Sequence, residues 1–389
     1  MTGDRMQWRN LIAASAAVAV FSFTLGMMFP LLALIMESWG TSSSTIGLNA
    51  AIAPAGIMVA GMLIPRLARR FGSRNVALGA AFLTAATTLS YPLLPNLGAW
   101  FALRFLQGAT VACLFALSEA WVVKFSEGPM RGRIVGAYAT VISASFGLGP
   151  LVIKLFGIEG VLPFVAGAVV LLAAMLPISL VDDRTAEATD REEQHVSIFG
   201  FAPKAPLLLL AIFMHSVFDG AMLSLLPVYG VKNGYDERTA ALLITAVALG
   251  NVFFQIPIGW IADRTSKAGT MAACFLSLTV LVLLLPAAIG SAAVWPLVTV
   301  VGAAGFGIYT VGLAMLGDRF RGTDLVAGTA AFSMVWGAGA LVGTAGSGWA
   351  MDLFGPDGLP YFLAAAFAAF IGIVAVGRSS GAGLTEDRS

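Results

Sequence analysis

Long apolar stretches recur along the whole chain and are separated by short polar segments. A helix that crosses the hydrocarbon core of a bilayer needs about 20 predominantly apolar residues. The pattern therefore predicts an all-α membrane protein, with the lipid bilayer as its surroundings. The twelve predicted transmembrane helices lie at residues 10–36, 45–66, 75–94, 98–123, 134–156, 160–180, 206–230, 239–261, 269–289, 293–316, 325–350 and 359–377.

Composition narrows the function classes. Of the 389 residues, 58% are hydrophobic and 11% are charged, whereas a soluble domain has roughly 25% charged residues. The net charge of +1 gives no reason to expect a nucleic-acid partner. Cys113 and Cys274 both lie in apolar stretches, which argues against a disulfide framework or a metal site. The sequence has no nucleotide-binding or catalytic motif, so we expect no cofactor and no enzymatic activity.

Basic residues are divided unequally between the two sides of the predicted membrane. With the N-terminus inside, the inner segments contain 18 of the 22 lysines and arginines. Only Lys154, Lys232 and Arg238 fall outside, and Arg104 lies within a span. Cytoplasmic loops are enriched in lysine and arginine. Both termini are therefore predicted to be cytoplasmic, in a plasma membrane that we expect to be a bacterial inner membrane.

The two halves of the sequence repeat one another. Phe29-Pro30-Leu31 matches Leu226-Pro227-Val228 at an offset of 197 residues, and Gly136 matches Gly328 at an offset of 192. Between the halves, a mixed run of acidic and basic side chains is typical of a solvated linker. We therefore expect a six-helix bundle at 1–180, a cytoplasmic linker at 181–205, and a second six-helix bundle with a short tail at 206–389.

The loop after the eighth span carries a signature. Gly259-Trp-Ile-Ala-Asp263-Arg264-Thr-Ser-Lys267 resembles the sequence G-x-x-x-D-R-x-G-R/K of the major facilitator transporters. The resemblance implies two six-helix bundles that alternate in exposing a central site. It also implies a gating role for these residues, with the glycine allowing close helix packing and the basic residues anchoring the inner surface.

The first-half copy of this signature departs from the family pattern. Pro65 replaces the glycine and Arg69 replaces the acid. Three residues of the signature remain: Arg70, Gly72 and Arg74. In the family the acid helps to hold the inner gate, and a basic residue cannot make the same contact. We hypothesise that Arg69 pairs with Asp318 or Asp324 of the other half; the alternative is an anchor at the inner surface.

Two further motifs lie in the fourth and fifth spans. Arg104-Phe-Leu-Gln107-Gly108 resembles the family sequence R-x-x-Q-G, which implies help with proton coupling. An intramembrane arginine should face the protein interior, so the alternative is a brace for neighbouring backbones. Gly136, Ser145 and Gly149-Pro150 keep the spacing of the antiporter signature g-x8-G-x3-G-P-x2-G-G. In the family this signature marks exporters. Two parts of it differ in this chain: Ser145 replaces a glycine, and Ile153-Lys154 replaces the closing Gly-Gly.

Ionisable residues inside spans are candidates for function. His215 and Asp219 are four residues apart in the seventh span and share a helix face. Asp219 is predicted to be a proton or cationic-substrate site, with His215 assisting. The alternative is a neutralised local pair that only orders the helix.

Glu119 lies roughly 22 Å along the same helix from Arg104, so the two cannot pair. It is predicted to be an inward-side proton acceptor or a gate contact to Arg131-Gly132-Arg133. The segment Ser118-Glu119-Ala120-Trp121 is similar to a YcaD-like branch of the family. Several further polar and aromatic residues are predicted to line a substrate path, although most also suit interhelical hydrogen bonding: Gln107, Asn251, Gln255, Tyr309, Thr310 and Trp336.

Together these features predict a secondary active transporter that works as a monomer. The leading interpretation is proton-coupled export of small amphipathic organic molecules. A mixed polar and aromatic lining suits such a ligand better than a sugar. The alternatives are a proton-coupled importer of an organic solute and, more remotely, a receptor or assembly factor on the same fold.

Overall fold

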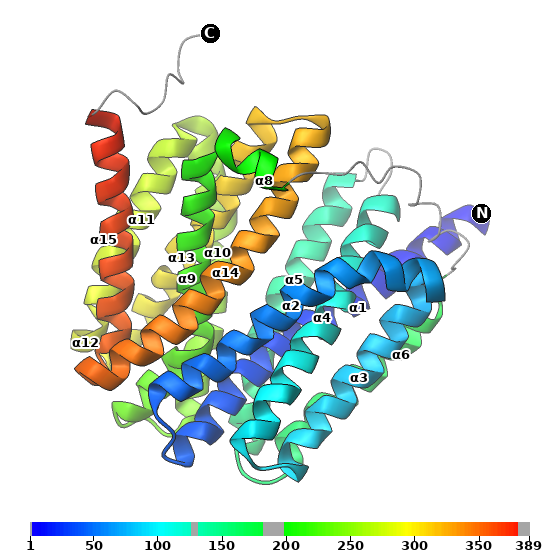
Figure 1. The fold of residues 1–389 in the computed structure, drawn as a ribbon, viewed down its shortest axis with the longest axis horizontal. Helices are drawn as coiled ribbons and strands as arrows, with labels where there is room; N and C mark the ends of the chain where they lie inside the picture. Colours follow the sequence, from blue (N-terminus) through cyan, green and yellow to red (C-terminus); the bar gives the residue numbers. More distant parts are fainter. Residues whose placement is uncertain (1, 126–130, 182–197, 380–389) are drawn as a thin grey trace.

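The computed structural model describes residues 2–125, 131–181 and 198–379 of the chain, and these residues form helices without a β-strand (Figure 1). Three short elements are α8 (Ile198–Phe201), η2 (Ala202–Lys204) and α12 (Leu285–Ala288). The twelve long helices are α1 (Thr2–Ser38), α2 (Ser43–Phe71), α3 (Ser73–Leu93), α4 (Leu97–Phe125), α5 (Arg131–Phe156), α6 (Leu162–Ser179), α9 (Pro206–Lys232), α10 (Glu237–Arg264), α11 (Lys267–Leu283), α13 (Val294–Arg319), α14 (Gly322–Phe354) and α15 (Gly358–Ser379).

The predicted all-α membrane fold is confirmed. Ten helices of the described residues are long and apolar enough to cross a membrane, and two shorter apolar segments lie at 140–156 and 267–283. The ninth predicted span, 269–289, is interrupted: α11 ends at Leu283 and α12 begins at Leu285. Pro286 has no backbone N–H to donate, which explains the break. Of the predicted linker, residues 198–204 form α8 and η2, and residues 182–197 lie outside the described residues.

Helices α1 to α6 pack as one group and α9 to α15 as another, and the groups lie side by side (Figure 1). They meet mainly where α2 contacts α14 and where α5 contacts α10, while α1 also contacts α9. The groups touch at the lower end in Figure 1 and diverge toward the upper end. We call these the closed end and the open end; the closed end contains the start of α2 and the end of α14.

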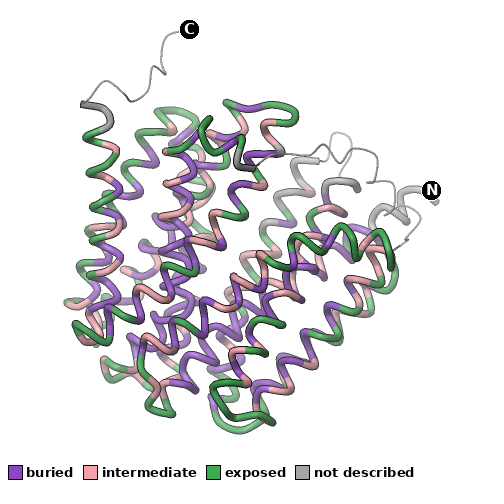
Figure 2. Tube along the Cα trace, viewed as in Figure 1, coloured by how far each residue is buried: buried purple, intermediate pink, exposed green. Residues whose placement is uncertain are grey.

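Small residues bring the two groups together at the closed end. A Cβ added to Gly47 of α2 would overlap the Thr344 carbonyl of α14, and one added to Gly348 would overlap that of Ser43. Buried residues accordingly gather in the lower, central part of the molecule (Figure 2). Large apolar side chains point outward elsewhere, such as Ile256 with 82% exposure, as expected for a surface covered by lipid.

The G-x-x-x-G pair of α14, Gly339 and Gly343, packs within the second group. Cβ atoms on these glycines would collide with the backbone carbonyls of Phe213 and Val217 in α9. Close helix packing is the usual use of this motif in membranes. Helix α9 is thereby held in the centre of its group.

Candidate functional site

Asp219 is a buried acid held by a neutral donor. It lies on α9 with 8% exposure, and its Oδ2 accepts a hydrogen bond of 3.0 Å from the indole Nε1 of Trp336 on α14. Among the described residues, no lysine, arginine or histidine forms an ion pair with it. A buried carboxyl without a fixed counter-charge can gain and lose a proton, which is the chemistry that a coupling site needs.

His215, one turn away, is bound to a different helix. Its Nδ1 lies 2.9 Å from the Gly305 carbonyl of α13, and a carbonyl only accepts, so Nδ1 carries the proton. Its ring packs against Tyr309 at 5.3 Å and Phe306 at 5.9 Å. His215 and Asp219 therefore contact α13 and α14 separately. The alternative of a local pair between them is wrong in this structure.

The predicted polar lining of α10 is engaged in protein contacts. Gln255 accepts a hydrogen bond from the Thr310 hydroxyl of α13. The Asn251 amide donates to the Ser143 hydroxyl of α5 at 3.4 Å, which joins the two groups of helices. These bonds agree with the structural alternative for Asn251 and Gln255. Tyr309 and Trp336 present aromatic surface beside His215 and Asp219.

Arg104 faces the interior of the first group, as predicted, with 1% exposure. Its guanidinium lies over the Phe29 ring at 3.9 Å. Nη1 donates to the Met28 carbonyl and to Gln107 Oε1, both at 3.4 Å, while Nε has no partner. Gln107 was predicted to line the substrate path, but it is 3% exposed and belongs to this network, where Tyr91 also reaches it.

Glu119 is exposed on α4. Tyr138 in α5 and Tyr309 in α13 lie within electrostatic range of its carboxylate. Glu119 therefore lies near both groups of helices. Its predicted gate contact involves residues 131–133, where the structure describes the backbone of α5 but not the side chains, so the contact stays a prediction.

The loop signatures lie at the open end. Lys267 contacts Asp318 at 2.6 Å and Asp263 at 3.5 Å, and Lys204 contacts Asp324 at 2.6 Å. Both acids proposed for Arg69 are thus paired with lysines: Asp318 with one of its own group of helices, and Asp324 with one of η2. The Arg69 pairing stays a prediction for a conformation in which this end is closed.

Other signature residues have local roles. Gly72 has φ of 81° between α2 and α3, a conformation that glycine adopts easily. Arg70 lies over Phe71 at 5.3 Å and Arg264 over Trp260 at 4.3 Å. The expectation that Gly259 permits close packing is wrong here, because a Cβ at this position would meet no atom within 4 Å.

The antiporter-like signature forms a close helix crossing. A Cβ on Gly149 of α5 would overlap the backbone of Gly26 and Met27 in α1. Helix α5 continues through Pro150 to Phe156. This signature therefore fixes α1 against α5 within the first group.

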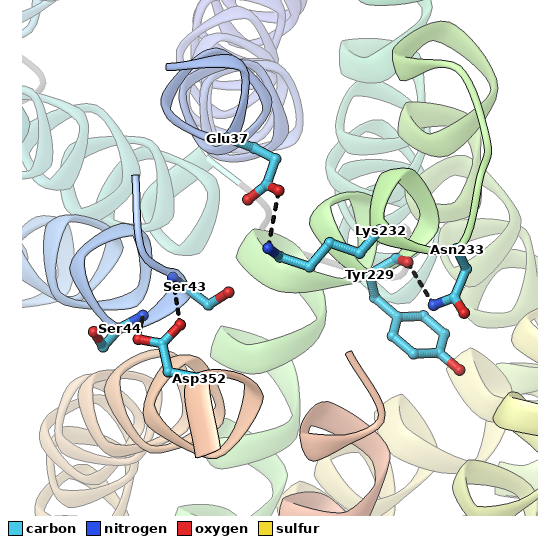
Figure 3. Close-up of polar contacts among 7 residues, drawn as sticks. All are labelled: Glu37, Ser43, Ser44, Tyr229, Lys232, Asn233 and Asp352. Carbon is cyan, nitrogen blue, oxygen red and sulfur yellow. Dashed lines mark hydrogen bonds and ion pairs between the residues drawn. The ribbon is translucent and has the colours of Figure 1, made fainter. Parts of the chain in front are cut away.

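Sequence reasoning missed a polar cluster at the closed end (Figure 3). Lys232 Nζ of α9 lies 2.9 Å from Glu37 Oε1 of α1. Asp352 of α14 accepts the backbone N–H groups of Ser43 and Ser44 in α2, at 2.8 and 2.9 Å. The signal was present, since isolated charges close otherwise apolar spans at these three positions.

The family model described as "Major Facilitator Superfamily" matches residues 14–236 and 208–381. The chain belongs to this superfamily. It is similar to the uncharacterised MFS-type transporter YfkF of Bacillus subtilis (strain 168), at 24% identity over 359 residues, covering 89% of this chain and 90% of the relative. It is likewise similar to the uncharacterised MFS-type transporter YcaD of Escherichia coli (strain SE11), at 25% identity over 379 residues and 96% of both chains.

Solved structures share the fold of this major facilitator transporter. A nucleoside transporter, a point mutant of NupG, superimposes with a TM-score of 0.79 at 12% identity, covering 95% of this chain and 98% of that one. A D-xylose-proton symporter superimposes with a TM-score of 0.71 at 16% identity, covering 93% and 95%. The predicted family and its YcaD-like branch are therefore confirmed, and the chain is an integral membrane protein of a transporter family.

Proposed function

We propose that this transporter couples the export of small amphipathic organic molecules to proton entry. Asp219 carries the proposal, because its buried carboxyl has a neutral partner, Trp336, and no ion-pair partner among the described residues. Proton binding removes the charge of this carboxyl and so changes its bond to α14. Helix α14 contacts α9 in its own group and α2 in the other. The protonation state of Asp219 is thereby linked to the packing of α14 between the two groups.

The surroundings of Asp219 support an amphipathic substrate. Tyr309, Phe306 and Trp336 supply aromatic surface around the acid. Glu119 adds a second carboxylate on the facing group. The Asn251 amide nitrogen and the Gln255 amide oxygen are bound to other side chains, and the Gln255 Nε2 is a buried donor without a partner that a polar group of the substrate could take. Export is supported by the antiporter-like signature around Gly149.

A test uses purified protein in proteoliposomes that contain the pH dye pyranine. A probe is added outside: Hoechst 33342 as an amphipathic molecule, and uridine or D-xylose as polar solutes. An antiporter exchanges the entering probe for a leaving proton, so the lumen becomes alkaline. A symporter takes a proton in with the probe, so the lumen becomes acidic. We expect alkalinisation with Hoechst 33342 and no response to the polar solutes.

Asp219→Asn should abolish this response, because the amide cannot exchange a proton. Ser216→Ala is the matched control, since the Ser216 hydroxyl donates only to its own helix, at Ile212. Intact proton-coupled flux in Asp219→Asn would refute the coupling assignment. Acidification of the lumen would instead support the symport alternative, which the fold shared with a D-xylose-proton symporter keeps in view.

A further inference from the structure

The polar contacts at the closed end join elements that belong to different groups of helices. Glu37 and Lys232 close the last turns of α1 and α9. Asp352 in the last turn of α14 accepts from the first two amides of α2 (Figure 3). We call the three side chains Glu37, Lys232 and Asp352 the closed-end latch.

Asp352 acts as a helix cap supplied by the other half of the protein. The first amides of a helix have no partner within it. In α2, Ser42 accepts from the Thr45 amide at 3.3 Å, and Asp352 takes the amides of Ser43 and Ser44 with one oxygen each. A carboxylate at this position also interacts favourably with the positive end of the helix dipole. Capping α2 therefore requires α14 to stay close.

The repeat of the two halves does not reproduce this cap. The offset of 192 residues that relates α5 to α14 places Gly160 opposite Asp352, and glycine offers no carboxylate. The start of α10 is capped within its own half, where Asp236 accepts the Thr239 amide at 3.0 Å. At the matching contact of α5, the Arg238 guanidinium packs over Gly157. A carboxylate cap and glycine packing thus hold the α2–α14 side. The α5–α10 side is held by hydrogen bonds from Thr245 to the Gly147 carbonyl and from Asn251 to Ser143, beside the packing of Arg238.

The latch is accessible to water and can be broken. The side chains of Lys232 and Glu37 are 29% and 16% exposed, and Asp352 is exposed. Water competes for Lys232 and Asp352, which weakens their contacts. Glu37 is less exposed, and its Oε2 is buried without a hydrogen-bond partner, so Lys232 supplies its main favourable contact. Next to the Asp352 cap, Gly47 and Gly348 bring the backbones of α2 and α14 into direct contact.

We propose that the closed-end latch is a reversible gate, in which the trans-cap from Asp352 and the Lys232–Glu37 pair set how often the closed end opens. The contacts must break together when the two groups of helices separate at the closed end, because one joins α1 to α9 and the other joins α2 to α14. Loss of either shifts the population toward a state in which this end is open.

Distance measurement between spin labels tests the gate without any substrate. Cys113 and Cys274 are replaced by alanine, and labels are attached to Leu48→Cys in α2 and Leu353→Cys in α14, which are 50% and 55% exposed. The parent protein in nanodiscs should give a dominant short distance. Asp352→Ala should raise the ratio of long to short distances about fivefold, the equivalent of a lost helix cap.

Asp357→Ala is the matched control. Asp357 lies five residues further on and accepts from the Tyr229 hydroxyl at 3.1 Å, a contact within one half. Its distance distribution should equal that of the parent. Glu37→Lys and Lys232→Glu should each raise the long-distance population, and the double variant should restore the parent distribution.

The proposal fails if Asp352→Ala gives the same distribution as Asp357→Ala. It also fails if the double charge reversal does not restore what the single reversals change. A single short distance in every variant would likewise refute a gate at these residues. These outcomes do not depend on the substrate or direction of transport.

Discussion

Arg104 is deeply buried, and few favourable contacts compensate for the burial of its charge. It is 1% exposed, its two hydrogen bonds are 3.4 Å long, and its Nε has no partner. Among the described residues it forms no ion pair, and its closest favourable contact is the Phe29 ring. A buried charge without an opposite charge costs several kcal/mol. The bond to the Met28 carbonyl fits a brace, and the missing counter-charge fits a role in proton coupling, so substitution of Arg104 separates the two interpretations.

Arg104→Met should therefore abolish proton-coupled flux while leaving the melting temperature in detergent unchanged or higher. Methionine keeps the apolar volume over Phe29 and removes the desolvated charge, a replacement that often costs nothing in stability. Arg104→Lys should retain part of the flux, since it keeps the charge but not the planar stacking. A melting temperature lowered by more than about 5 °C in Arg104→Met, equivalent to over 1 kcal/mol, would favour the brace.

The contacts between side chains could be predicted from the sequence only in part. The sequence singled out Asp219 as a buried acid, because a charge in an apolar span is conspicuous. It did not reveal the partner, since Trp336 lies 117 residues away and nothing local marks an indole as a donor. Gln107 was assigned to the substrate path for a similar reason. Helix periodicity indicates the face of α4 on which a residue lies, but only the packing of α3 against α4 shows that Tyr91 covers Gln107.

At the scale of helices, two glycines that both belong to signature motifs have opposite surroundings. Gly149 sits against the backbone of α1, whereas Gly259 faces open space. Both belong to family-like signatures, so the motif alone did not distinguish them. The span boundaries were also set too short, because α2 and α14 continue past the apolar residues on polar turns that hydropathy does not detect.

Gly149→Ala should strongly reduce stability, because its Cβ would force α5 away from Gly26 and Met27. We expect the loss typical of an overpacked core, about 1–3 kcal/mol, measured as a lower melting temperature and lower yield of folded protein. Gly259→Ala is the matched change in an unobstructed helix and should be neutral or stabilising by up to about 1 kcal/mol. Equal effects of the two substitutions would show that the α1–α5 crossing is not tight.

At the scale of the molecule, the repeat and the helix count followed from hydropathy and spacing. The structure accordingly has two groups of helices, and it shares this fold with other major facilitator proteins. The conformation did not follow, because a sequence encodes every state of the transport cycle at once. The divergence at the open end and the contacts at the closed end describe one of those states.

The side of the membrane that the closed end faces decides what this state means. The excess of lysine and arginine in the segments of the open end predicts that the open end is cytoplasmic.

Glu159→Cys lies in the exposed loop after α5 at the closed end, and Arg66→Cys lies on the exposed last part of α2 at the open end. A membrane-impermeant maleimide added to intact cells should label Glu159→Cys, whereas Arg66→Cys should react only after the cells are permeabilised. Both positions are exposed, so a difference in labelling reports the side of the membrane rather than burial. The reverse pattern would place the termini outside, make this an outward-open state, and move the closed-end latch to the cytoplasmic face.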